Sequence, residues 1–109
     1  MELQGRTAVV TGGAVRIGRA ISLALARQGA HVFIHYNRSI GPAEALRDEI
    51  LATGGVAAIG SGDLSDPGQA HGLMHLAQDT LGPMAVLVNS ASAFPTDTLE
   101  EITLDGWRS

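Results

Sequence analysis

The chain has 109 residues, of which 45% are hydrophobic and 17% are charged, and its formal net charge is −4. This composition is typical of one folded domain rather than a disordered chain, and the acidic balance argues against a nucleic-acid partner. The chain has no cysteine, and its seven basic residues are all arginine. Disulfides, thiolate metal sites, a lysine Schiff base and the lysine-dependent phosphate loop of nucleoside triphosphatases are therefore excluded.

The amino-terminal segment carries no export signal. Residues 1–5 lack the charged and then apolar pattern of a signal peptide, and no apolar run in the sequence approaches the length that spans a bilayer. We therefore expect a cytoplasmic protein without a membrane partner.

Apolar runs and turn-forming segments alternate along the chain. We predict strands over 6–11, 31–35, 56–59 and 84–88, and helices over 16–28, 42–52 and from 65 or 66 to 81. Strand and helix alternate without repeats, which favours an α/β fold with a doubly wound parallel sheet of the Rossmann type. The strand order expected for such a sheet is 3-2-1-4.

The apolar spacing predicts which helix residues face the sheet. For the first helix these are Ile17, Ala20, Ile21, Ala24 and Leu25. For the second and third helices they are Ala43, Leu46, Ile50, Ala70, Leu73, Met74, Ala77 and Leu81. His71, His75 and Asp79 share another face of the third helix, a spacing that can bind zinc. Because no further ligand is evident, we interpret them as solvated and predict no metal site.

A glycine-rich turn joins the first predicted strand to the first helix. Residues 11–18 read Thr-Gly-Gly-Ala-Val-Arg-Ile-Gly. Such a turn lets backbone N–H groups approach a diphosphate, and the following helix adds the positive end of its dipole. The sequence therefore predicts a dinucleotide site formed by Gly12, Val15, Arg16, Ile17 and Gly18. The alternative is a turn that serves only close packing of strand and helix.

The end of the second strand lacks the acidic residue of an NAD site. A ribose-binding carboxylate is expected about 20 residues after the turn, yet no Asp or Glu occurs over 30–43. A carboxylate would repel a 2′-phosphate, whereas Arg38 and Arg16 attract one and Ser39 can donate a hydrogen bond. We therefore predict NADP(H) as the cofactor, with His35 near its adenine half. The alternative is that both arginines are solvated surface residues.

The order of these features resembles the short-chain dehydrogenase/reductase family. Residues 11–18 are similar to the family's T-G-x-x-x-G-x-G turn, with Arg16 in place of the middle glycine. Residues 63–64 are similar to the pair that reaches the adenine in the family, and residues 89–92 to its N-N-A-G segment. The resemblance implies that further cofactor contacts come from Asp63, Leu64, Ser90, Ala91 and Ser92.

Within the family, the sequence is most similar to pteridine reductases and related dihydropterin reductases. The likeness lies in Arg16, in residues 35–39 (His-Tyr-Asn-Arg-Ser) and in residues 89–94. It implies that Asn37 lies in the cofactor site with its two neighbours. It also implies that Phe94 stacks on a pterin substrate held against the nicotinamide. The alternative for Phe94 is a loop aromatic that packs into the core.

The family's proton-donating residues are absent. The family uses a Tyr-x-x-x-Lys pair and a serine, but here Tyr36 is the only tyrosine and no lysine exists. We therefore expect no catalytic residue in this chain and no activity from it alone.

Residues 1–109 are accordingly interpreted as an incomplete NADP-binding domain of Rossmann type. It would be the front part of a short-chain oxidoreductase whose intact form reduces a C=N or C=O group, with a pterin favoured. Two alternatives stay open: a non-catalytic NADP(H)-binding or interaction module, and a reductase of another carbonyl substrate. Because the family's further strands are missing, the edge of the fourth strand is expected to promote homo-oligomers.

Overall fold

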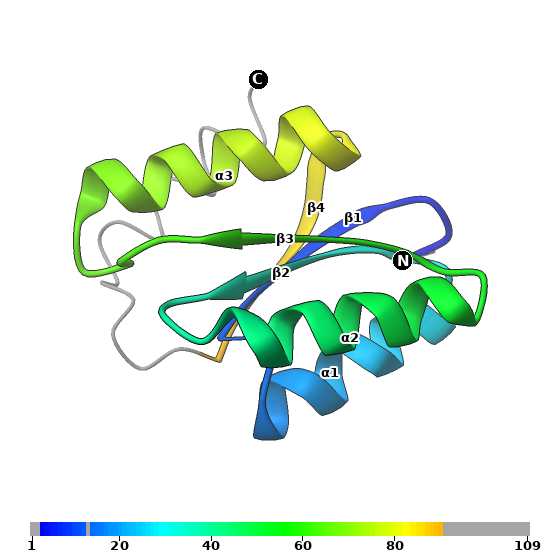
Figure 1. Ribbon diagram of the computed structural model, residues 1–109. Coiled ribbons are helices and arrows are strands. Elements are labelled where there is room, and N and C mark those ends of the chain that lie inside the picture. Colours follow the sequence, from blue (N-terminus) through cyan, green and yellow to red (C-terminus); the bar gives the residue numbers. More distant parts are fainter. Residues whose placement is uncertain (1–2, 13, 91–109) are drawn as a thin grey trace.

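The computed structural model, which describes residues 3–12 and 14–90, shows a four-stranded parallel sheet between two layers of helices (Figure 1). The strands are β1 (Thr7–Thr11), β2 (His31–Tyr36), β3 (Val56–Ser61) and β4 (Met84–Asn89). The helices that connect them are α1 (Arg16–Arg27), α2 (Ile40–Ala52) and α3 (Pro67–Leu81). The order β3-β2-β1-β4 confirms the predicted Rossmann-like sheet.

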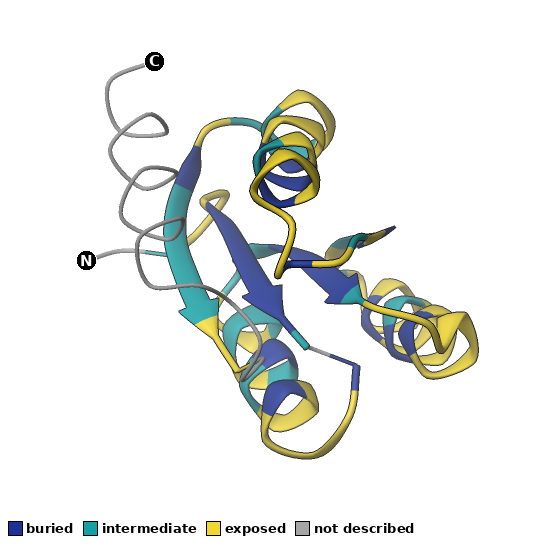
Figure 2. Cartoon of the chain, turned by 90° about the vertical axis from the view of Figure 1, so that its left-hand side faces the viewer, coloured by how far each residue is buried: buried dark blue, intermediate teal, exposed yellow. Residues whose placement is uncertain are grey.

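The central strands are covered on both faces. Val9 and Phe33 pack against α3, whereas Val10 and Ile34 pack on the side of α1 and α2. All of β1 is buried, as Figure 2 shows. Parallel strands buried on both faces are apolar at successive positions, which explains the continuous apolar runs in the sequence.

The helices α2 and α3 present the predicted faces to the sheet. Ala43, Leu46 and Ile50 are buried on α2, and Ala70, Leu73, Met74 and Ala77 are buried on α3. The cap of α3 is Asp66, whose carboxylate accepts the N–H groups of Gly68 at 2.9 Å and Gln69 at 3.4 Å. This cap satisfies two of the amides that a helix start leaves without partners.

The predicted face of α1 is correct at Leu25, which packs against the core, but wrong at most of its other positions. Its buried residues are Gly18 and Ser22, whereas Ile17 is 72% exposed and Ala20 and Ala24 are also exposed. A glycine at the contact lets the helix lie close to the sheet. The Ser22 hydroxyl donates to the Gly18 carbonyl at 2.8 Å, so this buried polar group is satisfied inside the helix. Small residues therefore form the fully buried part of the contact, and the partly buried Leu23, Leu25 and Ala26 also pack against the core.

The predicted element ends differ from the observed ones by one or two residues. β2 and β3 continue to Tyr36 and Ser61, and α2 begins at Ile40 rather than at Pro42. Proline is tolerated there because the amides of the first turn have no partner inside the helix. None of the helices in the described ranges is long and apolar enough to cross a membrane.

Candidate nucleotide-binding site

A pocket of about 370 Å³ lies at the carboxyl edge of the sheet, beside β1, β2 and β3. Three loops that follow these strands form its walls, with the lining residues Gly12, Ala14, Val15, His35, Tyr36, Asn37, Arg38, Ser39, Gly62, Asp63 and Leu64. Most of the predicted site residues are therefore brought together. Ala14, Tyr36 and Gly62 line the pocket but were not among them. The sequence marks these three residues only by their positions near strand ends. Tyr36 ends β2, Gly62 follows β3 directly, and Ala14 lies three residues after the end of β1.

His35 joins the first and third of these loops. Its ring is almost fully buried, at 3% exposure. The Gly12 N–H donates to Nδ1 at 2.9 Å, and Nε2 lies 2.9 Å from the Gly62 carbonyl oxygen. Because Nδ1 accepts, the ring proton resides on Nε2, which donates to Gly62. Burial lowers the pKa of His35 below its usual 6.5, and the bond to Gly62 partly opposes that shift.

The loop after β3 is held by its own polar groups. The Asp63 carboxylate accepts the Ser65 N–H at 3.0 Å and the Ser65 hydroxyl at 2.6 Å. The Asp63 N–H donates to the Gln69 side-chain oxygen at 2.9 Å. The bonds from Ser65, and secondarily the charge of Arg38, lower the pKa of Asp63. Asp63 is therefore ionised at neutral pH, and Leu64 beside it is buried in the core on the α3 side.

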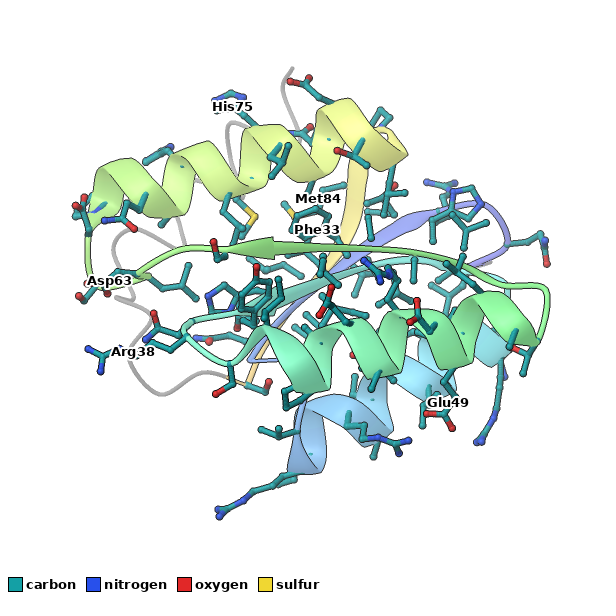
Figure 3. All side chains as sticks on the ribbon, in the orientation of Figure 1. Phe33, Arg38, Glu49, Asp63, His75 and Met84 are labelled. Atoms are coloured by element: carbon teal, nitrogen blue, oxygen red, sulfur yellow. The ribbon has the colours of Figure 1, made fainter. Side chains whose placement is uncertain are left out.

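Arg38 carries the positive charge of the pocket. It lies with Asn37 and Ser39 in the exposed loop between β2 and α2. Figure 3 shows Arg38 and Asp63 at the same end of the sheet, with Glu49 toward the opposite end. Within the described ranges Arg38 forms no salt bridge, so its guanidinium is available to an anionic ligand.

Arg16 begins α1 in an unusual backbone conformation. Its φ is +52°, in the left-handed region that favours glycine. This is the position at which the predicted turn pattern has a glycine. Arg16, Ile17 and Gly18 follow Val15 directly but do not line the pocket. Val15 precedes α1, and its side chain does not cap the first amides of the helix.

Ser90 ties the end of β4 to the end of β1. Its N–H donates to the Thr11 hydroxyl oxygen and to the Thr11 carbonyl, both at 3.2 Å, and its hydroxyl donates to the same carbonyl. The Thr11 hydroxyl in turn donates to the Asn89 side-chain oxygen at 3.0 Å. Ser90 is thus engaged by protein groups beside the glycine turn. The predicted site residues Ala91, Ser92 and Phe94 lie outside the described residues.

The third helix shows no metal centre in the part of the chain that is described. There, no three His, Cys, Asp or Glu side chains form a group that could hold a metal ion. His75 and Asp79 are exposed on α3.

The family model of the short chain dehydrogenases matches residues 6–109. The chain belongs to this family. The family assignment confirms the resemblance drawn from the glycine turn and the strand ends, and it accounts for the position of the pocket. In open α/β sheets, ligands bind at the carboxyl ends of the strands, near the point where the strand order reverses.

Curated relatives differ in their substrates and in their lengths. An uncharacterised oxidoreductase of Methylorubrum extorquens is 39% identical over 98% of this chain, and an L-rhamnose 1-dehydrogenase (NAD(P)(+)) of Sphingomonas is 37% identical over 94% of it. The chain spans only 43% and 41% of these two relatives. The short-chain dehydrogenase/reductase homolog YusS of Bacillus subtilis is 36% identical, and the match covers 96% of this chain and 99% of that protein.

Solved structures with similar folds include two proteins named as alternative dihydrofolate reductases. FolM alternative dihydrofolate reductase 1 of Brucella canis, complexed with NADP, is 42% identical with a TM-score of 0.78, and the match covers 86% of this chain and 37% of that one. The Brucella suis protein of the same name, also in complex with NADP, is 34% identical with a TM-score of 0.86. That match covers 99% of this chain and 50% of the other.

Proposed function

We propose that this chain is the NADP(H)-binding part of a short-chain oxidoreductase. The observation that carries the proposal is one pocket at the carboxyl edge of the sheet, lined by the glycine turn, by Arg38 with no acidic residue on its loop, and by Asp63. Its volume lies within the range of about 300–1,000 Å³ found for small-molecule sites. The NADP complexes of the similar FolM structures support the choice of cofactor.

The residues present fit this dinucleotide. The turn after Gly12 and the start of α1 would hold the diphosphate through backbone amides and the positive end of the helix dipole, because Val15 gives the helix no side-chain cap. The Gly12 N–H itself is bonded to His35. Arg38, Ser39 and Arg16 would hold the 2′-phosphate, and the Asp63 loop would bound the adenine. When bound, the nicotinamide supplies the hydride of the family's reaction.

The chain as given should bind the cofactor without turning over a substrate. A reductase needs a proton donor near the accepting atom. The only tyrosine, Tyr36, lines the pocket at the end of β2, and the sequence has no lysine to lower a tyrosine's pKa. A non-catalytic NADP(H)-binding module is therefore the second candidate function. Turnover of any pterin or carbonyl substrate by the pure 109-residue chain would rule it out.

For the intact form we favour a pterin or dihydropterin as the substrate. The likeness to the two FolM proteins and the Arg16 turn support this choice. The L-rhamnose dehydrogenase among the relatives keeps another carbonyl substrate as the competing proposal. We also propose, from the sequence, that the protein forms homo-oligomers and is cytoplasmic.

The cofactor proposal is tested by Arg38→Ala. Hydrogen bonds to charged groups contribute about 1.5–3 kcal/mol, so NADPH should bind about 10- to 100-fold more weakly while NADH binding hardly changes. The matched control is Arg27→Ala, which removes an arginine from the last turn of α1 and should alter neither affinity. Calorimetry that shows equal losses for both cofactors in Arg38→Ala would contradict the assignment of Arg38 to the 2′-phosphate.

A further inference from the structure

The floor of the pocket contains a buried, titratable side chain that the proposed contacts with NADP(H) do not use. His35 lies at the end of β2, between the strand ends of β1 and β3, and accepts one hydrogen bond and donates another. Both partners are backbone groups of the loops that form the pocket walls. One ring therefore fixes the separation of the glycine turn and the Asp63 loop.

The bond to Gly12 determines the start of the glycine turn. Gly12 has a φ of +62°, and its N–H is occupied by His35 Nδ1. Without that acceptor, a largely buried N–H would lose its partner, which favours a rearranged turn. The bond from Nε2 to the Gly62 carbonyl holds the other wall, because residue 62 precedes Asp63 directly.

We infer that His35 is a positioning residue for the cofactor, whose neutral Nε2–H imidazole sets the glycine turn for the diphosphate and the Asp63 loop for the adenine. The inference rests on the proposed NADP(H) site. It differs from a direct cofactor contact, since both ring nitrogens are used by protein groups. It also differs from a role in the stability of the fold alone, because the glycine turn depends only on the hydrogen bond that Nδ1 accepts from Gly12.

Protonation of the ring would break this arrangement. An imidazolium donates from both nitrogens, so Nδ1 could no longer accept the Gly12 N–H. The charged and titratable groups that line the same pocket as the ring are Arg38 and Tyr36 from β2 and its loop and Asp63 from the β3 loop. On α1, Arg16 follows the lining residue Val15 but does not itself line the pocket. β1 contributes no titratable side chain at this end, and none of these groups supplies a charge that shifts His35.

Two substitutions separate the acceptor from the donor. The side chain of His35→Asn carries an amide oxygen at about the reach of Nδ1, so it can still accept the Gly12 N–H. The longer His35→Gln carries an amide N–H at about the reach of Nε2, so it keeps a donor for Gly62 and loses the Gly12 acceptor. NADPH should bind the Gln variant about tenfold more weakly than the Asn variant. Equal affinities would overturn the inference.

The pH dependence gives a second readout. As the pH falls below about 6.5, far enough to protonate His35, the wild-type chain should lose NADPH affinity relative to His35→Asn. Burial lowers the pKa of His35, so the loss begins below its usual value, and only the wild type protonates at this position. The titration of the cofactor's own phosphate is common to both chains and cancels in the ratio. A constant ratio, or one that rises on acidification because the imidazolium attracts phosphate, would overturn the inference.

Nuclear magnetic resonance of the ligand-free wild-type chain tests the inference even if the variants fail to fold. In the wild type, the ¹⁵N shifts of His35 should show an unprotonated Nδ1 and a protonated Nε2, and the Gly12 amide should exchange slowly. The opposite tautomer or a rapidly exchanging Gly12 amide would overturn the inference. Complete absence of NADPH binding by the wild type would instead refute the proposed function, and the positioning role with it.

Discussion

At the scale of single residues, we propose that the glycine turn gives up stability in favour of ligand binding. Arg16 adopts a φ of +52°, and a residue with a Cβ in this region costs about 1–2 kcal/mol relative to its ordinary conformations. A glycine would avoid the cost. The arginine instead places a cationic residue directly after Val15, which lines the pocket. Backbone strain of this kind is concentrated at ligand sites.

Arg16→Gly should therefore stabilise the chain while weakening its binding to NADPH. Glycine removes the strain of the left-handed conformation, but its larger conformational entropy in the unfolded chain offsets part of this gain. The free energy of unfolding should therefore rise by about 0.5–1 kcal/mol. The control Arg19→Gly lies inside the same helix, where glycine should lower that free energy by about 1 kcal/mol. Urea denaturation and calorimetry measure the two effects. A destabilised Arg16→Gly, or one with unchanged NADPH affinity, would contradict this interpretation.

At the scale of the elements, the distance between α3 and the sheet depends on one glycine. Gly60 of β3 is buried, and a Cβ there would lie 2.5 Å from Phe33 Cζ and 3.2 Å from Leu73 Cδ1. Both neighbours belong to the core on the α3 side. The close contact lets the Phe33 ring fill the space between β2 and the helix.

Gly60→Ala should consequently destabilise the fold. Overpacking a core by one methyl group costs about 1–3 kcal/mol. The matched control is Gly72→Ala on the exposed face of α3, where an added Cβ meets nothing within 4 Å. That change should raise the free energy of unfolding by about 0.5–1 kcal/mol, because alanine favours the helix. Thermal unfolding that ranks the two variants in the opposite order would refute the packing argument.

Most elements could be predicted from the sequence because the spacing of apolar residues differs clearly between a strand and a helix. The apolar runs of β1, β2 and β4, and the spacing on α2 and α3, each matched one period. α1 was different, since its spacing of large apolar residues pointed to a face that includes Ile17, which is exposed. Close helix–sheet contact favours Gly18 and Ser22, and the size of the gap between two elements cannot be read from hydropathy.

The candidate site was predictable in part for a related reason. Loops that follow parallel strands meet at one edge, so Gly12 and Arg38 could be assigned to one site from their order. The resemblance to the family added Asp63. The role of His35 could not be assigned in that way. Its two backbone partners, Gly12 and Gly62, depend on the register of neighbouring strands. Hydrogen bonds across a fold leave no periodic trace in the sequence.

At the scale of the whole molecule, the described sheet has a strongly apolar strand at one of its edges. β4 forms one edge, and its residues 85–88 are half-buried although they are all apolar. Figure 2 shows this contrast with the fully buried β1 beside it. Exposed apolar edge strands are templates for pairing with another chain.

The isolated chain should therefore associate through β4. Light scattering should show a mass that rises above the monomer with concentration, and the β4 amides should become protected from hydrogen exchange in the associated form. A stable monomer at high concentration with freely exchanging β4 amides would refute this prediction. Association that protects other segments but leaves β4 exchanging would equally contradict it.

We propose that the pocket at the carboxyl edge binds NADP(H) and selects it by its 2′-phosphate. Calorimetric titration of the full chain with NADPH and with NADH, in the same buffer, tests this most directly. Since Arg38 should contribute one or more charge-assisted hydrogen bonds, NADPH should bind about 10- to 100-fold more tightly than NADH. Equal affinities, or a preference for NADH, would contradict the account.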